Sequence, residues 1–248
     1  MNGILKKTSV VLFTGITIGS LWLMSLGLVG TIWAYVLILF NIFRVLLEIL
    51  GARKISEKLN ISTKIKEEIP RKVGHMLICL VTLPMIYFSF IGTWHTFTFC
   101  ILALIAAFIM AKTGLLDIMI SRSTKETSNN SSIFDMIVGF FINSTVAIFI
   151  PQYAIPTALG FTALGLGDPM ACLIGKKFGK HKFKNGKSVE GVLGFIVGAT
   201  ISMFIMTHVS IWKLLIIATV GAVVELYSED YDNVCIQLAV ALVAVFLL

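Results

Sequence analysis

Residues 165–195 read GLGDPMACLIGKKFGKHKFKNGKSVEGVLGF. A single carboxylate, Asp168, stands in an apolar run, and six lysines follow it within residues 176–187. After Lys187 the chain enters a second apolar run. Long apolar runs joined by a short basic loop are typical of helices that cross a membrane and return. The stretch therefore predicts two membrane spans with a charged connection.

The composition of the whole chain agrees with this interpretation. Hydrophobic residues make up 57% of the 248 residues and charged residues 13%, with a mean hydropathy of +0.95. These values lie outside the range of soluble domains. A span needs about 20 largely apolar residues, so we expect an all-α polytopic membrane protein with about nine transmembrane helices. The expected spans lie near residues 9–28, 31–50, 73–91, 95–117, 134–150, 153–174, 190–209, 211–228 and 233–248.

We expect one integral membrane domain over residues 1–248. Residues 1–70 would form a two-span extension with a basic cytoplasmic loop, and residues 71–248 the catalytic core. The first apolar run is too long for a signal peptide and has no cleavage pattern, so we expect it to be retained.

Lysine and arginine placement predicts the orientation. If the N-terminus is cytoplasmic, the outer turns hold only Lys213, whereas the inner segments hold these basic residues: Lys6, Lys7, Arg53, Lys54, Lys58, Lys64, Lys66, Arg71, Lys72, Arg122, Lys125, Lys176, Lys177, Lys180, Lys182, Lys184 and Lys187. The net charge of +7 then reflects anchoring to the bilayer, not a nucleic-acid partner. Polar chemistry is expected at the cytoplasmic face, in the cytoplasmic membrane if the source is a prokaryote.

The segment Gly165–Pro169 predicts an interruption of the sixth span. Asp168 is a good helix N-cap and Pro169 suits the first helical position, so we expect one broken helix near Asp168. An ionisable residue at such a break is a functional candidate. Two interpretations stay open: Asp168 caps a helix, or it also holds Mg²⁺, which proteins bind through one or two carboxylates plus substrate phosphates.

The lysine-rich loop has two interpretations as well. It is a basic surface on anionic lipid, or a polyphosphate site in which Gly179 and Gly186 allow close folding around main-chain N–H groups. Ser188 is the expected N-cap of the next helix, and a helix N-terminus binds anions. Lys187 and Ser188 would therefore meet phosphate, and Glu190 could join Asp168 on the metal. Lys182 and Lys184, in the middle of the loop, have no expected fixed partner and would serve the membrane surface.

A second constellation begins the third span, where Arg71, Lys72 and His75 follow Pro70. Cations at a helix N-terminus oppose the helix dipole, and a bound anion would relieve that conflict. Arg71 and His75 are four residues apart and share one helical face. The alternative is that Arg71 and Lys72 are membrane anchors and that His75 is a core residue. Membrane anchoring alone explains the arginine and the lysine but not the histidine.

The third constellation is the acidic segment from Glu225 to Asn233, which contains Asp232 and no lysine or arginine. Basic-residue topology does not explain these carboxylates. They are a solvated loop, or they supply a second metal ligand or a general base.

Taken together and in this order, the motifs resemble those of the CTP-dependent lipid kinases of the polyprenol kinase group. The resemblance rests on Arg71–His75, on Gly167-Asp168-Pro169 with Gly175 and Gly179, on Lys187-Ser188-x-Glu190-Gly191, and on Asp232-Asn233 with Glu225 upstream. The Lys187–Gly191 segment is also similar to a motif of the phosphatidate cytidylyltransferases. That family has Asp-Thr-Gly-Ala where this chain has Asp168-Pro169-Met170-Ala171, so the kinases are favoured and the cytidylyltransferase stays an alternative.

The resemblance implies CTP-dependent phosphorylation of a membrane lipid alcohol (a polyprenol or dolichol, a phytol-like alcohol or diacylglycerol), with Mg²⁺ as cofactor. It implies that Asp168 and Glu190 hold the metal, that Asp232 orients or deprotonates the lipid hydroxyl, and that Asn233 and Glu225 support it. The residues implied to bind the phosphates are Arg71, Lys72, His75, Lys176, Lys177, Lys187 and Ser188. A membrane transporter is a further alternative, because broken helices and buried acids also mark transport pathways.

Overall fold

The computed structural model describes residues 51, 54–58, 62, 65, 66, 68, 69, 72–76, 101, 105, 131–228 and 231–248. Within these ranges every regular element is a helix and there is no strand, which confirms the expected all-α class. The predicted spans 9–28, 31–50, 73–91 and 95–117 lie wholly or largely outside the described residues. The count of nine spans and the cytoplasmic N-terminus therefore stay predictions.

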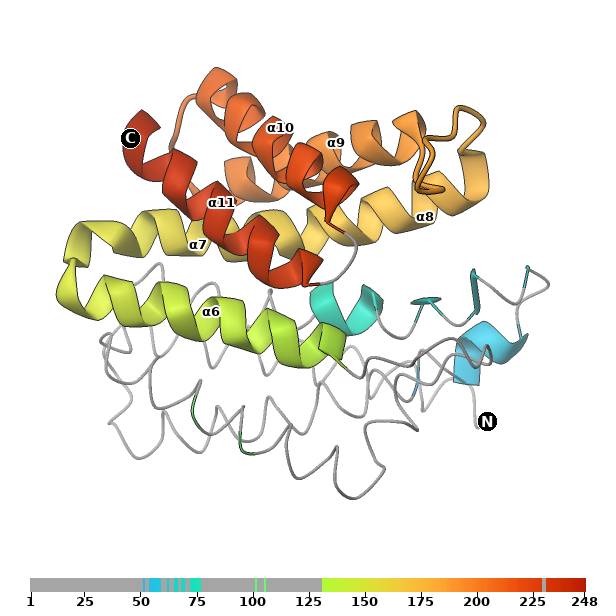
Figure 1. Cartoon of the computed structure of the whole chain (residues 1–248), viewed down its shortest axis with the longest axis horizontal. Coiled ribbons are helices and arrows are strands. Elements are labelled where there is room, and N and C mark those ends of the chain that lie inside the picture. The colour runs from blue at the N-terminus through green and yellow to red at the C-terminus, as the bar shows by residue number, and fades with distance from the viewer. Residues whose placement is uncertain are drawn as a thin grey trace, which may run out of the picture.

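The described helices follow the predicted spans from residue 131 onward to within about four residues at each end (Figure 1). In chain order they are α6 (Ser131–Phe149), the 3-10 turn η1 (Pro151–Tyr153), α7 (Ala154–Thr162), the π-helical segment η2 (Ala163–Gly167), α8 (Asp168–Phe178), α9 (Val189–Met206), α10 (Ile211–Tyr227) and α11 (Asp232–Leu247). The hydropathy pattern alone was sufficient to locate them, because each helix is apolar over most of its length.

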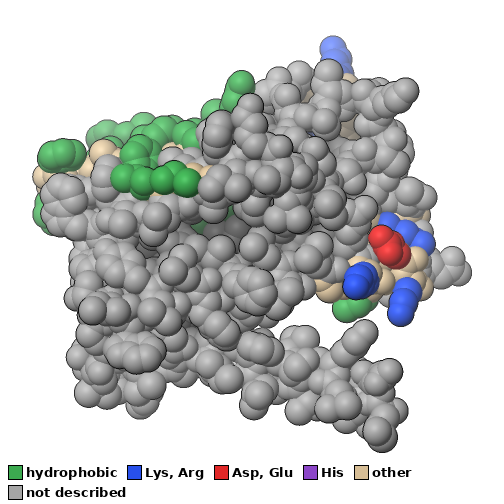
Figure 2. All heavy atoms as spheres, turned by 90° about the horizontal axis from the view of Figure 1, so that it is seen from below, with side chains coloured by type: hydrophobic (Ala, Val, Ile, Leu, Met, Phe, Trp, Pro, Cys, Tyr) green, Lys and Arg blue, Asp and Glu red, His purple; other side chains and the backbone are tan. Residues whose placement is uncertain are grey.

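Two stretches of the described chain are long and apolar enough to cross a membrane, Pro151–Phe178 with 28 residues and Val189–Met206 with 18. The outer face of α9 carries large exposed apolar side chains, including Leu193, Ile201 and Ile205. A water-facing helix would carry polar residues there. On the face shown in Figure 2, described apolar side chains gather at one end and a cluster of described charged side chains lies at the other. These features support a membrane protein.

The α-helix is interrupted near Asp168, as expected, but by the π-helical segment η2 and not by a break in the helical backbone; α8 begins at Asp168 itself. Helical structure runs without interruption from Pro151 to Phe178, and Asp168 has α-helical dihedrals (φ −62°, ψ −44°); it is not an N-cap. Pro169 in a regular helix would clash with the carbonyl one turn earlier. The wider π-helical turn of η2, directly before Asp168, gives the chain another way to accommodate that proline. Such π segments recur at functional sites.

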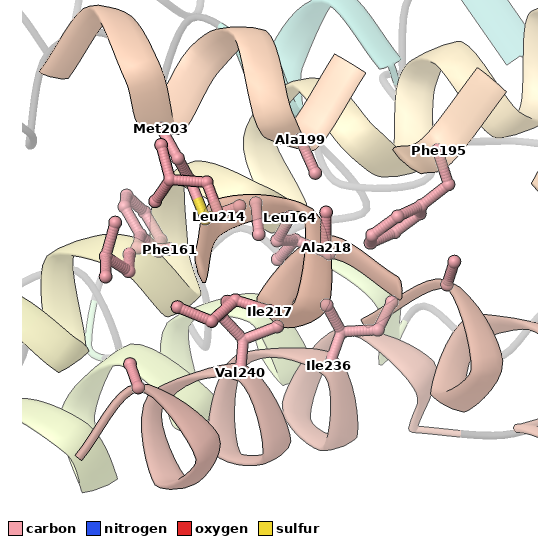
Figure 3. Close-up of a cluster of buried hydrophobic side chains, with 14 of the residues drawn as sticks. Phe161, Leu164, Phe195, Ala199, Met203, Leu214, Ile217, Ala218, Ile236 and Val240 are labelled. Atoms are coloured by element: carbon pink, nitrogen blue, oxygen red, sulfur yellow. The ribbon is translucent and has the colours of Figure 1, made fainter. Parts of the chain in front are cut away.

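The helices pack in the order α8, α9, α10, α11, with α6 and α7 against α11. Their common core contains Phe161, Leu164, Phe195, Met203 and Ile217, all buried (Figure 3). The Phe195 ring lies between two glycines: a Cβ on Gly167 would come within 3.0 Å of the ring and a Cβ on Gly221 within 2.9 Å. The π segment is thus held directly against α9 and α10.

Helix α7 approaches α11 closely at Gly160. A Cβ there would lie 2.5 Å from the carbonyl oxygen of Gln237, so no side chain fits unless a backbone moves. Gln237 is fully buried and donates from Nε2 to the carbonyl of Met136 at 2.9 Å and to that of Asn233 at 3.0 Å. Interhelical hydrogen bonds and small residues are the usual means of joining helices in membranes. This junction fixes the start of α11.

Gly160→Ala is expected to lower the free energy of unfolding by about 1–3 kcal/mol, because the added methyl group must displace α7 or α11. Thermal unfolding in detergent, followed by circular dichroism, measures the effect. Gly51→Ala is the matched control, because a Cβ at Gly51 meets nothing within 4 Å. Equal melting temperatures for the two variants would contradict the close approach.

Candidate active site

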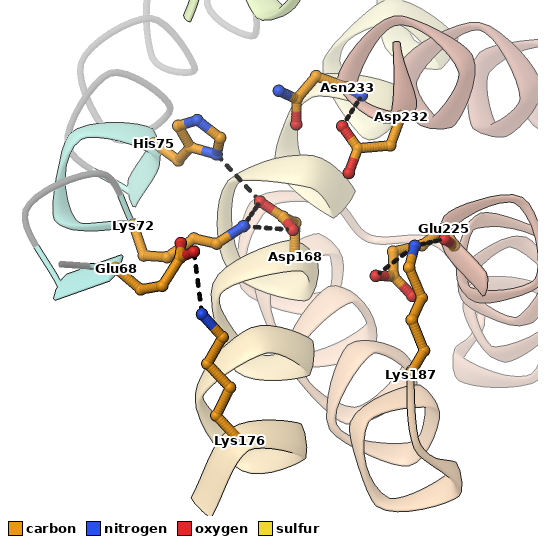
Figure 4. Close-up of polar contacts among 9 residues, drawn as sticks. All are labelled: Glu68, Lys72, His75, Asp168, Lys176, Lys187, Glu225, Asp232 and Asn233. Carbon is orange, nitrogen blue, oxygen red and sulfur yellow. Dashed lines mark hydrogen bonds and ion pairs between the residues drawn. The ribbon is translucent and has the colours of Figure 1, made fainter. Parts of the chain in front are cut away.

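Asp168 lies where the helical segment 72–76 meets the start of α8 (Figure 4). Lys72 Nζ donates to both carboxylate oxygens, at 2.6 Å to Oδ1 and 2.5 Å to Oδ2, and His75 Nδ1 lies 3.0 Å from Oδ2. All three residues are at most 3% exposed. Lys72 and His75 are three residues apart, so one face of the helix presents both to Asp168. Arg71 lies outside the described residues.

A second ion pair joins the same two parts of the chain. Lys176 Nζ lies 2.9 Å from Glu68 Oε1. Glu68 is four residues before Lys72, and Lys176 is eight residues after Asp168. The residue numbers increase along one segment as they decrease along the other, so the described residues 68, 69 and 72–76 run antiparallel to α8. Cys172, between the two ion pairs on α8, is within electrostatic reach of Lys72 and Glu68. The two ion pairs therefore fix both the distance and the register of these segments.

The lysine-rich loop 179–188 folds as a small hairpin. Lys182 and Ser188 form an isolated antiparallel bridge, and the Phe183 N–H donates to the Lys187 carbonyl at 2.8 Å. Gly186 turns the chain with φ +81°, a conformation that favours glycine. The expectation that Lys182 has no fixed partner is wrong: its ammonium donates to the Gly175 carbonyl at 3.2 Å, at the C-terminal end of α8. The hairpin places this lysine there.

The far side of the hairpin is attached to the C-terminal end of α10. Lys187 Nζ lies 3.0 Å from Glu225 Oε1, donates to the Glu225 carbonyl, and lies 3.1 Å from that of Ser228. Asn185 Nδ2 donates to the Leu226 carbonyl at 2.6 Å. The last carbonyls of a helix have no partner within the helix, and cations and amides satisfy them. The ammonium of Lys187 is thus held at the end of α10.

Asn185→Ala is expected to speed tryptic cleavage of the hairpin by about two- to tenfold or more, because it removes two hydrogen bonds, one to the Leu226 carbonyl and one from the Lys187 N–H, each worth about 0.5–1.5 kcal/mol. Limited proteolysis of the folded protein, with the cleavage sites read by mass spectrometry, measures the rate. Thr219→Ala on α10 is the control, since its hydroxyl bonds only within its own helix, to Leu215. An unchanged rate for Asn185→Ala would show that the hairpin does not depend on these contacts.

Ser188 begins α9 as predicted. Its hydroxyl accepts from the Gly191 N–H at 3.1 Å, which confirms the N-cap. Glu190 lies in the first turn, and His181 Nδ1 is 2.8 Å from its Oε1. Among the described residues no contact joins Glu190 to Asp168, and no three histidine, cysteine or acidic side chains there are grouped to hold a metal.

The acidic segment reaches the same region from α11. Tyr231 adopts φ +60° directly before the helix, and the Asp232 side chain accepts from the Asn233 N–H at 2.8 Å. Figure 4 shows Asp232 and Asn233 on one side of Asp168 and Glu225 with Lys187 on another. The site thus combines residues from segment 72–76, α8, the hairpin, the end of α10 and the start of α11.

Most of the predicted site residues lie in one region, in three contact groups: Lys72 and His75 with Asp168, Lys187 with Glu225, and Asp232 with Asn233. Lys72, His75, Asp168, Lys187 and Asp232 share the region of Figure 4. Lys177 is exposed, with its ammonium 5.1 Å from the centre of the Phe178 ring. Glu68, His181 and Asn185 were missed. For Glu68 the spacing of four from Lys72 was a usable signal, and for Asn185 the signal was the Asn-Gly turn.

A family model described as the cytidylyltransferase family matches residues 16–247. The chain belongs to the cytidylyltransferase family. The chain is 35% identical to "Dolichol kinase sec59" of Schizosaccharomyces pombe over 99 residues, which are 36% of this chain and 19% of that protein. "Dolichol kinase" of Saccharomyces cerevisiae is 33% identical over 88 residues, 32% of this chain and 17% of the relative. The match thus spans about a fifth of the length of these relatives. No solved structure matches.

Proposed function

We propose that this member of the cytidylyltransferase family transfers the γ-phosphate of CTP to the hydroxyl of a membrane lipid alcohol of the polyprenol type. The proposal is carried by the meeting of the sequence motifs around Asp168, in a chain whose two named relatives are dolichol kinases. A lipid alcohol remains in the bilayer, and CTP is a charged solute. A basic region at the end of apolar helices gives both a place to meet.

In this proposal, lysines and main-chain N–H groups neutralise the triphosphate. Lys72 and His75 lie deepest, beside Asp168, and Lys187, Ser188, Lys176 and Lys177 surround the outer phosphates, with Arg71 as a further predicted contact. The lipid oxygen attacks the γ-phosphorus, the bond from that phosphorus to the bridging oxygen breaks, and CDP leaves. Asp232, supported by Asn233 and Glu225, receives the hydroxyl proton. Phosphoryl transfer depends mainly on such positioning and charge neutralisation.

The carboxylate oxygens of the site have the chemistry that Mg²⁺ prefers. Because Mg²⁺ usually completes its coordination with water and substrate phosphate, one or two carboxylates suffice. Asp168 is the proposed ligand, with Glu190 as the second predicted one. When bound, Mg²⁺ would neutralise charge on the phosphates.

Transfer of label from CTP tests the proposal. Purified protein is incubated with CTP labelled at the α or the γ position, together with polyprenols, diacylglycerol or phosphatidic acid. We expect γ label in a lipid alcohol and release of CDP. Label from the α position in the lipid, with release of pyrophosphate, would instead establish the alternative cytidylyltransferase reaction, to which the family description corresponds only distantly.

A further inference from the structure

The groups around Asp168 could also bind an anionic ligand in place of its carboxylate. Both of its oxygens accept from the Lys72 ammonium, at 2.5 and 2.6 Å, and Oδ2 also lies 3.0 Å from the imidazole Nδ1 of His75; all three side chains are almost fully buried. Phosphate oxygens are bound by the same donors at similar distances. The carboxylate therefore fills a cradle whose chemistry also fits a phosphate group.

We propose that Asp168 is an internal counter-ion for the anion site of Lys72 and His75, and that a magnesium-bound triphosphate enters by ion exchange. The phosphate would bind to Lys72 and His75, and the carboxylate of Asp168 would then be available to hold Mg²⁺. This inference rests on the proposed function for the identity of the ligand. A further consequence is that neither a metal-free triphosphate nor Mg²⁺ alone binds well. The triphosphate meets the negative charge of Asp168, and Mg²⁺ meets the positive charge of Lys72.

The charges around Asp168 explain why the two ligands must arrive together. A triphosphate without metal is repelled by Asp168 and by Glu225, which lies within electrostatic reach of both Asp168 and Lys72. Mg²⁺ alone is repelled by Lys72 and Lys187. Removing one member of a buried ion pair leaves an uncompensated charge, which is strongly unfavourable. If the triphosphate and Mg²⁺ bind together, every charge keeps a partner. Binding of one ligand therefore favours binding of the other, and the difference is a coupling free energy between the two.

Lys187 and Glu225 repeat the pattern at a wetter position, with side chains 27% and 12% exposed. Solvent screens this second pair more than the first. The Asp168 pair, with side chains 3% and 4% exposed, is therefore where the coupling is expected to be strongest.

Binding of inorganic tripolyphosphate in the presence of EDTA tests the proposal without turnover. Asp168→Asn keeps the shape of the side chain and removes its charge, so it releases Lys72 and His75 for the anion. We expect this variant to bind metal-free tripolyphosphate at least about tenfold more tightly than the wild type, by titration calorimetry. Glu57→Gln is the control for net charge, because Glu57 is exposed, and we expect it to bind within twofold of the wild type.

Equal or weaker binding by Asp168→Asn would overturn the proposal, as would an equal gain in Glu57→Gln. If Asp168→Asn does not fold, Lys72→Met decides: removal of the ammonium should let Mg²⁺ alone raise its melting temperature by roughly 3 °C or more, against no change in the wild type. No such rise would also overturn it.

The two proposals fail separately. Transfer of the α-phosphate would refute the kinase and leave the ion exchange intact, since both reactions begin with magnesium-bound CTP. Unchanged anion binding by Asp168→Asn would refute the ion exchange and leave the label experiment to decide the reaction.

Discussion

Asp168→Asn is expected to lower the turnover of CTP by about a hundred- to a thousandfold, a loss typical of removing a group that stabilises charge in a transition state. The amide is a poor ligand for Mg²⁺ and cannot exchange its charge with the triphosphate. Steady-state transfer of γ label, at saturating CTP and lipid alcohol, measures the loss. The same variant is expected to bind metal-free tripolyphosphate more tightly. Asp168→Asn should therefore bind the anion better than the wild type and yet react far more slowly.

Glu68→Gln is the matched control for this loss. It also changes a buried carboxylate to an amide, and it breaks the ion pair of Glu68 with Lys176 on α8. If Asp168 matters only because it fixes the docking of segment 72–76 onto α8, the two variants should lose turnover equally. We expect Glu68→Gln to remain within about tenfold of the wild type, because a partly exposed ion pair contributes about 1 kcal/mol or less. Near-normal turnover of folded Asp168→Asn would refute the role of its charge.

Lys187→Ala is expected to lower kcat/KM for CTP by about ten- to a hundredfold or more. A charge-assisted hydrogen bond in a partly buried site contributes roughly 1.5–3 kcal/mol. The structure adds a second reason, because Lys187 attaches the hairpin and the N-terminus of α9 to the end of α10. Initial rates over a range of CTP concentrations, at a fixed lipid concentration, separate the effect on KM from the effect on kcat.

Lys184→Ala is the control for Lys187, since Lys184 is exposed in the same hairpin and should stay within a few-fold of the wild type. Lys182 contacts the Gly175 carbonyl, so Lys182→Ala is predicted to cause a small loss of hairpin stability, with little change in CTP kinetics. Equal losses in all three variants would show that the hairpin acts as an undifferentiated basic surface.

Features that depend on neighbouring residues could be predicted from the sequence. The bounds of α6, α9, α10 and α11 follow from runs of apolar residues, and the N-cap at Ser188 follows from a hydroxyl residue directly before such a run. The sequence predicted an interruption near Asp168 but not its form, a π-helical segment that keeps the helical backbone continuous. Gly, Asp and Pro together favour a helix start, and only the packing of Phe195 against Gly167 and Gly221 shows how the π-helical alternative is held in place.

The sequence by itself determined the all-α class, the apolar helices and the types of residue that can neutralise a triphosphate, because hydropathy and charge are properties of the residues themselves. Only the tertiary structure decided which charges meet. Lys72 contacts Asp168 across 96 positions of sequence, and Lys187 contacts Glu225 across 38. A lysine can pair with any acid that folding brings within about 4 Å, so its partner is selected by how the helices pack and not by its neighbours in the chain.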